Sequence, residues 1–211
     1  MKKQKMKMTA MAAGIVAGMI ASMSAAHAGV GDAATLQLSA AVTKTTCQID
    51  TGTGSNSVGV PFGSFTADEI FAYTKATPLA GNPVTLNFSH CSGEDIAAGS
   101  AVNLHAEGVM ANGSGGDAYG DSASNKGIGF NIQAAWTDTG TSSTAGSGLF
   151  SPGNPDLEIF NVPSAESTVT VNDLQLPSVT LTPQLFSFAS AVTDIPAQNL
   201  QVPVTLSIAY N

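Results

Sequence analysis

Short runs in which apolar and polar residues alternate recur along the chain from Thr35 onward, and segments rich in Gly, Ser, Asn, Asp and Pro separate them. A period of two is typical of strands with one buried face, and many short strands divided by turn residues indicate an all-β sandwich or barrel. Strands are predicted at Thr35 to Thr43, Val58 to Val60, Pro83 to Ser89, Ala101 to Ala106, Ile128 to Trp136, Thr168 to Val171, Val179 to Phe188 and Val202 to Tyr210. Only Asp68 to Lys75 is compatible with one or two helical turns.

Two segments between predicted strands, Ala111 to Gly127 and Thr137 to Ser151, are dense in Gly, Ser, Thr, Asp and Asn. These residues favour turns and exposed backbone, so we expect long, mobile surface loops. The sequence contains no internal repeat and no linker that would divide it, which predicts one domain.

The first and last predicted strands alternate most strictly. Near the N-terminus Leu36 and Leu38 share one face, and at the C-terminus the shared face carries Val204, Leu206, Ile208 and Tyr210. Each of these strands needs a neighbour for its open edge. The pattern alone leaves two interpretations open: the strands pair within an ordinary closed sandwich, or each takes a partner from another molecule.

The first 28 residues have the features of a secretory signal. Four of the seven lysines precede residue 8, an uncharged run extends from Met8 to Ala26, and a small-residue site follows at Ala26-His27-Ala28. Cleavage is predicted between Ala28 and Gly29. It leaves 183 of the 211 residues, with three lysines and no arginine against 15 acidic residues, a formal net charge of -12.

This charge balance excludes several classes of protein. A mature chain with so few cations lacks the basic surface that phosphate backbones and anionic membranes attract, so we expect no nucleic-acid or membrane-surface partner. No uncharged stretch after the signal approaches the roughly 20 apolar residues that span a bilayer, so no membrane insertion is expected. The 43% hydrophobic content also argues against global disorder.

The two cysteines, Cys47 and Cys91, both lie in the exported part of the chain. One disulfide is the simplest interpretation in an oxidising compartment, and two separate buried thiols are the alternative. On the chain-entropy model, a bridge over this separation stabilises the fold by about 4 kcal/mol. Two cysteines this far apart lack the paired spacing that structural zinc favours, so no metal and no other cofactor is predicted.

One segment, Gly120-Asp121-Ser122-Ala123-Ser124, is similar to the nucleophile segment of some serine hydrolases. A nucleophilic serine needs a base within hydrogen-bond reach, and the mature chain offers only His90 and His105. Neither follows the chain order of a known triad, so a solvated loop is the preferred interpretation and no catalytic residue is predicted.

Two further candidate sites are weak. Asp117 and Asp121 follow a Gly-Gly pair and could ligate calcium, but their spacing does not match an EF-hand loop. Trp136 and Tyr119 could stack on a sugar, although aromatic residues at strand ends more often pack in or near the core.

Several motifs follow one another in the same order as in a known protein family. After the signal peptide and the short alternating arm come Thr45-Thr46-Cys47-Gln48-Ile49-Asp50, then the segment Pro83 to Ser92 that ends in Cys91-Ser92, and finally Ile208-Ala209-Tyr210-Asn211. In this order and spacing the chain resembles the structural pilins of the chaperone-usher pathway, the type 1 fimbrial subunits of Gram-negative bacteria. The resemblance covers most of the mature chain.

The resemblance implies a fold and a set of partners. The fold is an all-β, incomplete immunoglobulin-like sandwich that lacks its last strand and is completed by the N-terminal donor strand of another subunit. The implied organisation is a signal peptide at 1–28, a donor-strand arm at 29–42 and a pilin domain at 43–211. The partners are a periplasmic chaperone, an outer-membrane usher, and identical or related pilin subunits in a head-to-tail fibre on the cell surface that supports adhesion.

The resemblance also implies site residues. The donor side chains are Ala34, Leu36, Leu38 and Ala40, and the strand that contacts the chaperone and lines the acceptor groove carries Val204, Leu206, Ile208, Tyr210 and Asn211. Two departures stand out. Where the family usually has an arm glycine, this chain has Ala34, and Asp194 to Asn199 replaces a Gly-rich turn before the last strand.

Three hypotheses follow. The first is a structural fibre subunit. The second is a fimbrial tip, adaptor or carbohydrate-binding adhesin subunit, and the third is a secreted hydrolase that uses Ser122. An arm close to the cleavage site leaves no room for a separate receptor-binding domain before the pilin domain, which favours the first.

Overall fold

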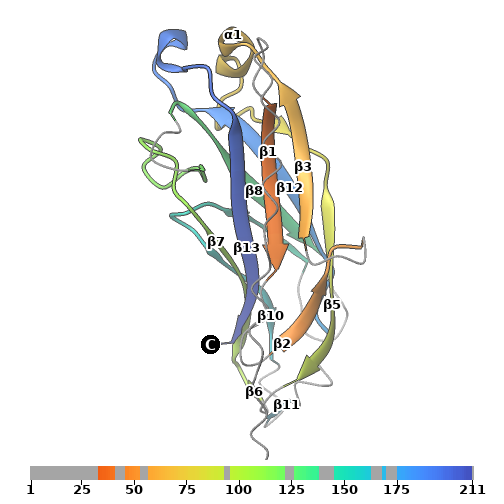
Figure 1. Cartoon of the computed structure of the whole chain (residues 1–211). Coiled ribbons are helices and arrows are strands. Elements are labelled where there is room, and N and C mark those ends of the chain that lie inside the picture. Colours follow the sequence, from red (N-terminus) through yellow and green to blue (C-terminus); the bar gives the residue numbers. More distant parts are fainter. Residues whose placement is uncertain are drawn as a thin grey trace, which may run out of the picture.

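The computed structural model describes residues 33–40, 46–52, 57–92, 96–121, 126–137, 145–162, 168–169 and 175–210, and every structural statement below concerns these residues. Within them the regular structure consists of strands, apart from the short helix α1 (Ala67–Phe71) and the 3₁₀ turn η2 (Val192–Asp194). Two curled sheets pack face to face in an elongated sandwich, with α1 at one end and the last strand ending at the other (Figure 1). The prediction of an all-β sandwich is confirmed.

The first sheet has the strand order β10-β7-β13-β1-β3. Its members are β10 (Asp156–Asn161), β7 (Ala101–Gly108), β13 (Leu200–Tyr210), β1 (Ala33–Ala40) and β3 (Ser57–Ser64). All neighbours in it are antiparallel except β1 and β13, which run parallel. The strands nearest the two ends of the described chain therefore lie side by side (Figure 1).

The second sheet has the order β2-β5-β12-β8-β9. Its members are β2 (Thr46–Asp50), β5 (Val84–Ser92), β12 (Val179–Ser187), β8 (Ile128–Trp136) and β9 (Gly146–Phe150), and β4 (Leu79–Ala80) pairs with β12. A separate small ladder joins β6 (Ile96–Ala97) to β11 (Thr168–Val169).

The core lies between the two sheets and is built by the alternation seen in the sequence. In the first sheet, every second residue of β13 from Leu200 to Ile208 is buried. In the second sheet, Phe130, Ile132 and Ala134 of β8 are fully buried, and β5 and β12 add the buried leucines Leu86, Leu181 and Leu185. Each of these strands thus contributes an apolar face to a single core.

Most predicted strands are present with small differences at their ends. The prediction at Ile128 to Trp136 coincides with β8, and that at Val202 to Tyr210 lies inside β13. The pattern missed β2, β9 and β10 as well as the short β4 and β6. The helix begins one residue before its prediction and ends at Phe71, and Thr66 and Glu69 form a capping box at its start.

The prediction of long surface loops is wrong in two places. In the segment from Ala111 to Gly127, Ala111, Ala118 and Tyr119 are fully buried, and the Tyr119 amide donates to the Phe130 carbonyl at 2.6 Å. In the segment from Thr137 to Ser151, β9 pairs with β8. Gly146 of β9 leaves room for the Trp136 ring, since a Cβ at this position would stand 2.5 Å from the ring and force a shift.

Candidate functional site

The strand β1 occupies the position between β13 and β3, and this is the feature on which a functional interpretation depends. Its register with β13 runs from Ala34 opposite Leu200 to Ala40 opposite Leu206. On its other edge it pairs antiparallel with β3, from Ala33 opposite Ser64 to Ser39 opposite Ser57. Of the two interpretations left open by the sequence, pairing of the two end strands within one chain is the arrangement of this structure.

The inward face of β1 is buried in the core. Leu36 is 0% exposed and Leu38 is 1% exposed, and Ala34 is 5% exposed. Burying a leucine contributes about 1.5–3 kcal/mol relative to leaving it in water. The two leucines together therefore provide much of the attachment of β1, and the ladders to β13 and β3 provide the rest.

The walls of this position come from the neighbouring strands. On β13 the buried residues Val202 and Val204 stand opposite Leu36 and Leu38. On β3, Val60 is 2% exposed and stands opposite Leu36. Without β1, these side chains and the edges of two strands would line an open apolar groove between β3 and β13, which we call the β1 groove.

The outward face of β1 makes polar contacts. The Ser39 hydroxyl lies 3.2 Å from the Thr205 hydroxyl of β13. The exposed Gln37 side chain lies over Gly59 of β3, where an added Cβ would stand 3.1 Å from its Nε2 atom. The inward leucines and these outward contacts fix the register of β1 together, because a shift by one residue would send the leucines to the solvent side.

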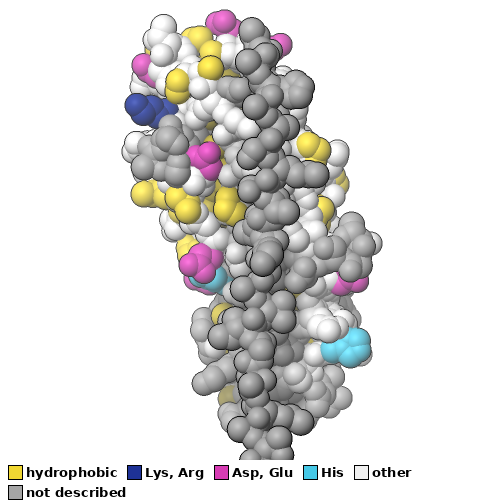
Figure 2. Space-filling view, viewed as in Figure 1, with side chains coloured by type: hydrophobic (Ala, Val, Ile, Leu, Met, Phe, Trp, Pro, Cys, Tyr) yellow, Lys and Arg dark blue, Asp and Glu magenta, His cyan; other side chains and the backbone are white. Residues whose placement is uncertain are grey.

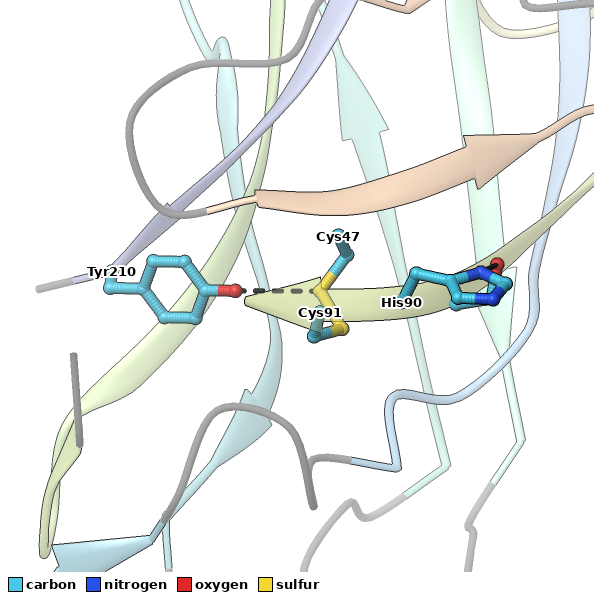
Figure 3. Close-up of a disulfide and its surroundings, with 5 residues drawn as sticks. Cys47, His90, Cys91 and Tyr210 are labelled. Atoms are coloured by element: carbon cyan, nitrogen blue, oxygen red, sulfur yellow. Dashed lines mark hydrogen bonds between the residues drawn. A yellow bond between two sulfur atoms is a disulfide. The ribbon is translucent and has the colours of Figure 1, made fainter. Parts of the chain in front are cut away.

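The predicted disulfide between Cys47 and Cys91 is present and joins β2 to β5. Beside it lies Tyr210, the last residue of β13, whose hydroxyl oxygen is 3.4 Å from the Cys47 sulfur (Figure 3). Partial burial raises the pKa of the Tyr210 hydroxyl above its ordinary value. The end of the C-terminal strand is therefore held against the disulfide of the opposite sheet.

The structure brings most of the predicted binding residues together. Ala34, Leu36 and Leu38 face the core from β1, and Val204, Leu206 and Ile208 face it from β13. Ala40 lies in β1 opposite Leu206 in the register. The predicted cleavage site at Ala28 and Gly29, and Asn211, lie outside the described residues.

For the hydrolase hypothesis, Ser122 lies outside the described residues. The His105 Nδ1 atom on β7 is 2.7 Å from the Asp156 Oδ1 atom on β10, its cross-strand partner. His90 makes a contact of 3.2 Å between its Nδ1 atom and the Ser89 hydroxyl. Both described histidines therefore have nearby polar partners on their own or the neighbouring strand.

Of the two candidate calcium ligands, Asp117 makes an ion pair. The Asp117 carboxylate pairs with the Lys75 ammonium at 2.7 Å, and both side chains are about half exposed. Within the described ranges, no group of three His, Cys, Asp or Glu residues is placed to hold a metal ion.

The sugar-stacking candidates have packing roles. Tyr119 is fully buried, its hydroxyl donates to the Ala106 carbonyl at 3.1 Å, and burial raises its pKa strongly. Trp136 is half-buried and covers Gly146. The sequence-based preference for packing over sugar binding therefore agrees with the position of both rings.

Two findings concern the charge of the surface and the length of the helices. Charged side chains are few and scattered among the described residues of the face that Figure 2 shows. No helix in the described ranges is long and apolar enough to cross a bilayer. The sequence predicted part of β3 at Val58 to Val60, but not that this strand pairs with β1, because a pattern within one strand does not identify its neighbour.

The sequence matches no protein-family model, and no curated protein is significantly similar to it.

Proposed function

We propose that this protein is a structural subunit of a cell-surface fimbria, assembled by exchange of its N-terminal strand between subunits. The observation that supports this function best is that β1, the first strand of the described chain, completes the core between β3 and β13 with its two leucines. A terminal strand is the part of a fold that a second copy can supply most easily, because only one connection has to move.

The sandwich without β1 is an immunoglobulin-like domain that lacks one strand. Its β13 edge would then present unpaired N–H and C=O groups along the whole length of the groove, a template for an incoming strand. A chaperone strand fills the groove in the periplasm, and the arm of the next subunit replaces it at the outer membrane. Donation from each subunit to the next is a heterologous contact that does not close, and it produces a fibre.

The experiment compares two chains that both lack residues 29–42 after the signal. One carries nothing further, and the other carries a copy of residues 29–46 after Asn211 through a flexible linker. We expect the second to be a monomer of much higher thermal stability, since the copy enters the β1 groove, and the first to aggregate unless a chaperone is present. Thermal unfolding followed by circular dichroism, with size-exclusion chromatography, measures both results.

A stable, soluble monomer from the chain without the arm would refute the proposal, because the domain would then need no strand from outside. The matched control replaces Leu36 and Leu38 by Asp in the appended copy. This control should behave like the chain without the arm, since two carboxylates cannot enter the apolar groove at acceptable cost.

A further inference from the structure

A polar cavity of about 380 Å³ opens at the second sheet, on the side away from the core. Three parts of the chain line it: Lys75 after α1, the turn Gly115 to Asp117, and the end of β9 with the turn that follows it, including Ser151 and Gly153. Its volume lies in the range of small-molecule sites, roughly 300–1,000 Å³. The β1 groove belongs to the first sheet, so this cavity is a separate feature of the molecule.

The floor of the cavity is the outward face of β8 and β9. Phe150 of β9 is fully buried in the core, so Leu149 and Ser151 on either side of it point outward, and both line the cavity. The register pairs Ile132 of β8 with Phe150, and its continuation by one residue sets Asn131 beside Ser151 on the same outward face. The cavity therefore lies next to the side chain of Asn131.

The amide of Asn131 is buried and unpaired. The residue is 1% exposed, and neither its Nδ2 nor its Oδ1 atom has a hydrogen-bond partner among the described residues. Gln133, the next outward residue of β8, has one, since its Nε2 atom donates to the Gly148 carbonyl at 3.0 Å. Because a buried polar group without a partner destabilises the folded chain, an unpaired amide beside a polar cavity indicates a role in binding rather than in packing.

The rim of the cavity carries an ion pair. The Lys75 Nζ atom lies 2.7 Å from the Asp117 Oδ1 atom, and both side chains are about half exposed. The two charges cancel, so the pair favours neither an anion nor a cation as ligand. An ammonium group only donates hydrogen bonds and a carboxylate only accepts them. Two neighbouring hydroxyl groups of one ligand match this pair, because one can accept from Lys75 while the other donates to Asp117.

Two glycine turns form the remaining wall. The Gly153 amide donates to the Gly116 carbonyl at 2.9 Å, and a Cβ on Gly153 would stand 3.2 Å from that oxygen. Gly116 itself has a φ of 97°, which side chains of L-residues rarely allow. The turns therefore meet without side chains of their own at these two positions, and Leu149 adds a small apolar surface. Donors, acceptors and one apolar patch within a small space suit a sugar ring.

We infer that this cavity binds one uncharged pyranose ring, either a free sugar or the terminal residue of a glycan. Two neighbouring hydroxyls of the ring bridge Lys75 and Asp117, and a further hydroxyl is directed to the Asn131 amide and Ser151 at the floor. The C–H groups of the ring rest on Leu149. The site does not depend on the proposed strand exchange, because β1 and its groove lie in the other sheet.

The experiment titrates the full chain with the methyl glycosides of glucose, galactose, mannose and N-acetylglucosamine, and with the free sugars. We expect at least one of these sugars to bind with a Kd of about 1 mM. In ¹⁵N-correlated NMR spectra it should shift the backbone signals of Gly115, Gly116 and Gly153 and the side-chain amide signals of Asn131. Binding of the glycosides identifies the end of a glycan as the ligand, and binding of the free sugars alone identifies a soluble sugar.

Substitutions at the rim test the role of the ion pair. Lys75→Met and Asp117→Asn should each weaken sugar binding at least about tenfold, since each removes a hydrogen bond to a charged group. Their thermal unfolding should change little, because an exposed ion pair contributes little to stability. The matched controls are Lys126→Met and Asp68→Asn, two exposed residues that do not line the cavity. Both controls should bind the sugar like the unmodified chain.

Substitutions at the floor separate binding from packing. Asn131→Leu should keep or raise the midpoint of thermal unfolding, since an apolar side chain of similar size replaces an unpaired amide, and it should weaken sugar binding at least about threefold. Gln133→Leu, on the same face of β8, should do the opposite. It loses the hydrogen bond to the Gly148 carbonyl and lowers the midpoint, but it leaves sugar binding unchanged.

Three results would overturn the sugar site. The first is that none of the sugars binds at about 50 mM. The second is binding that stays the same in Lys75→Met and Asp117→Asn, because the sugar would then lie elsewhere. The third is binding of glycerol, inorganic phosphate or Ca²⁺ at least as tightly as any sugar, because the cavity would then recognise a simple diol or a charge. None of these results bears on strand exchange, which the chains without the arm test separately.

Discussion

At the scale of single residues, the attachment of β1 depends on its two leucines. Leu36 has no exposed surface and stands between Val202 on β13 and Val60 on β3. Its neighbour Gln37 points the other way and is exposed. The contrast between adjacent positions on one strand offers a direct test of which face holds the arm.

We expect Leu36→Ala to lower the free energy of unfolding of the full chain by about 2–5 kcal/mol, since it removes buried methyl groups and leaves a cavity. Gln37→Ala, the matched control, should change it by less than about 0.5 kcal/mol. Urea unfolding curves measure both values. Equal effects of the two substitutions would mean that β1 is not held by its inward face.

At the scale of elements, two tyrosine hydroxyls join separate parts of the fold. Tyr210, at the end of β13, contacts Cys47 of the disulfide on β2, and Tyr119 donates to the Ala106 carbonyl on β7 of the first sheet. Burial raises the pKa of both tyrosine hydroxyls, because the phenolate is penalised in a poorly hydrated site. The folded chain therefore holds these two protons more tightly than the unfolded chain.

This difference predicts a loss of stability in alkali. The contribution of each tyrosine is fully present below its unfolded pKa of about 10 and is lost as the pH rises toward the higher folded value, since the unfolded chain releases the proton first. Urea midpoints between pH 8 and pH 11 should fall above about pH 10. Tyr210→Phe and Tyr119→Phe should each flatten this fall, and an unchanged profile in the double variant would exclude the two tyrosines as its cause.

At the scale of the whole molecule, the arm is both part of the core and a candidate for exchange. A tether of five residues gives the arm an effective concentration at its own groove of the order of mM. Arms of other copies in dilute solution cannot compete with it at equilibrium. The free subunit should therefore keep its own arm in the β1 groove at ordinary concentrations.

We expect the purified full chain to elute as a monomer at micromolar concentration. Heating at concentrations near mM should produce multimers that persist after dilution, because the arm must leave one groove before it enters another. Size-exclusion chromatography with light scattering measures both states. Multimers that form at once at micromolar concentration would show that the arm does not stay in the β1 groove of its own chain.

The sequence by itself determined the class of fold, because alternation along a strand is a local property that follows from the period of two. It also determined the disulfide and the buried faces of β1 and β13, since Leu36, Leu38 and Val204 to Ile208 alternate without interruption. The strand β9 was missed because it contains Gly146 and Gly148, which face the side chains of Trp136 and Leu157 closely and give no alternation of their own. The strand β10 was missed because prolines precede and follow its alternating Leu157 and Ile159, as in a loop. Only the tertiary structure decided that β1 lies between β3 and β13 of its own chain. The partner of a strand edge depends on residues far away in the sequence and on the reach of the connecting segment, and a pattern within one strand contains neither.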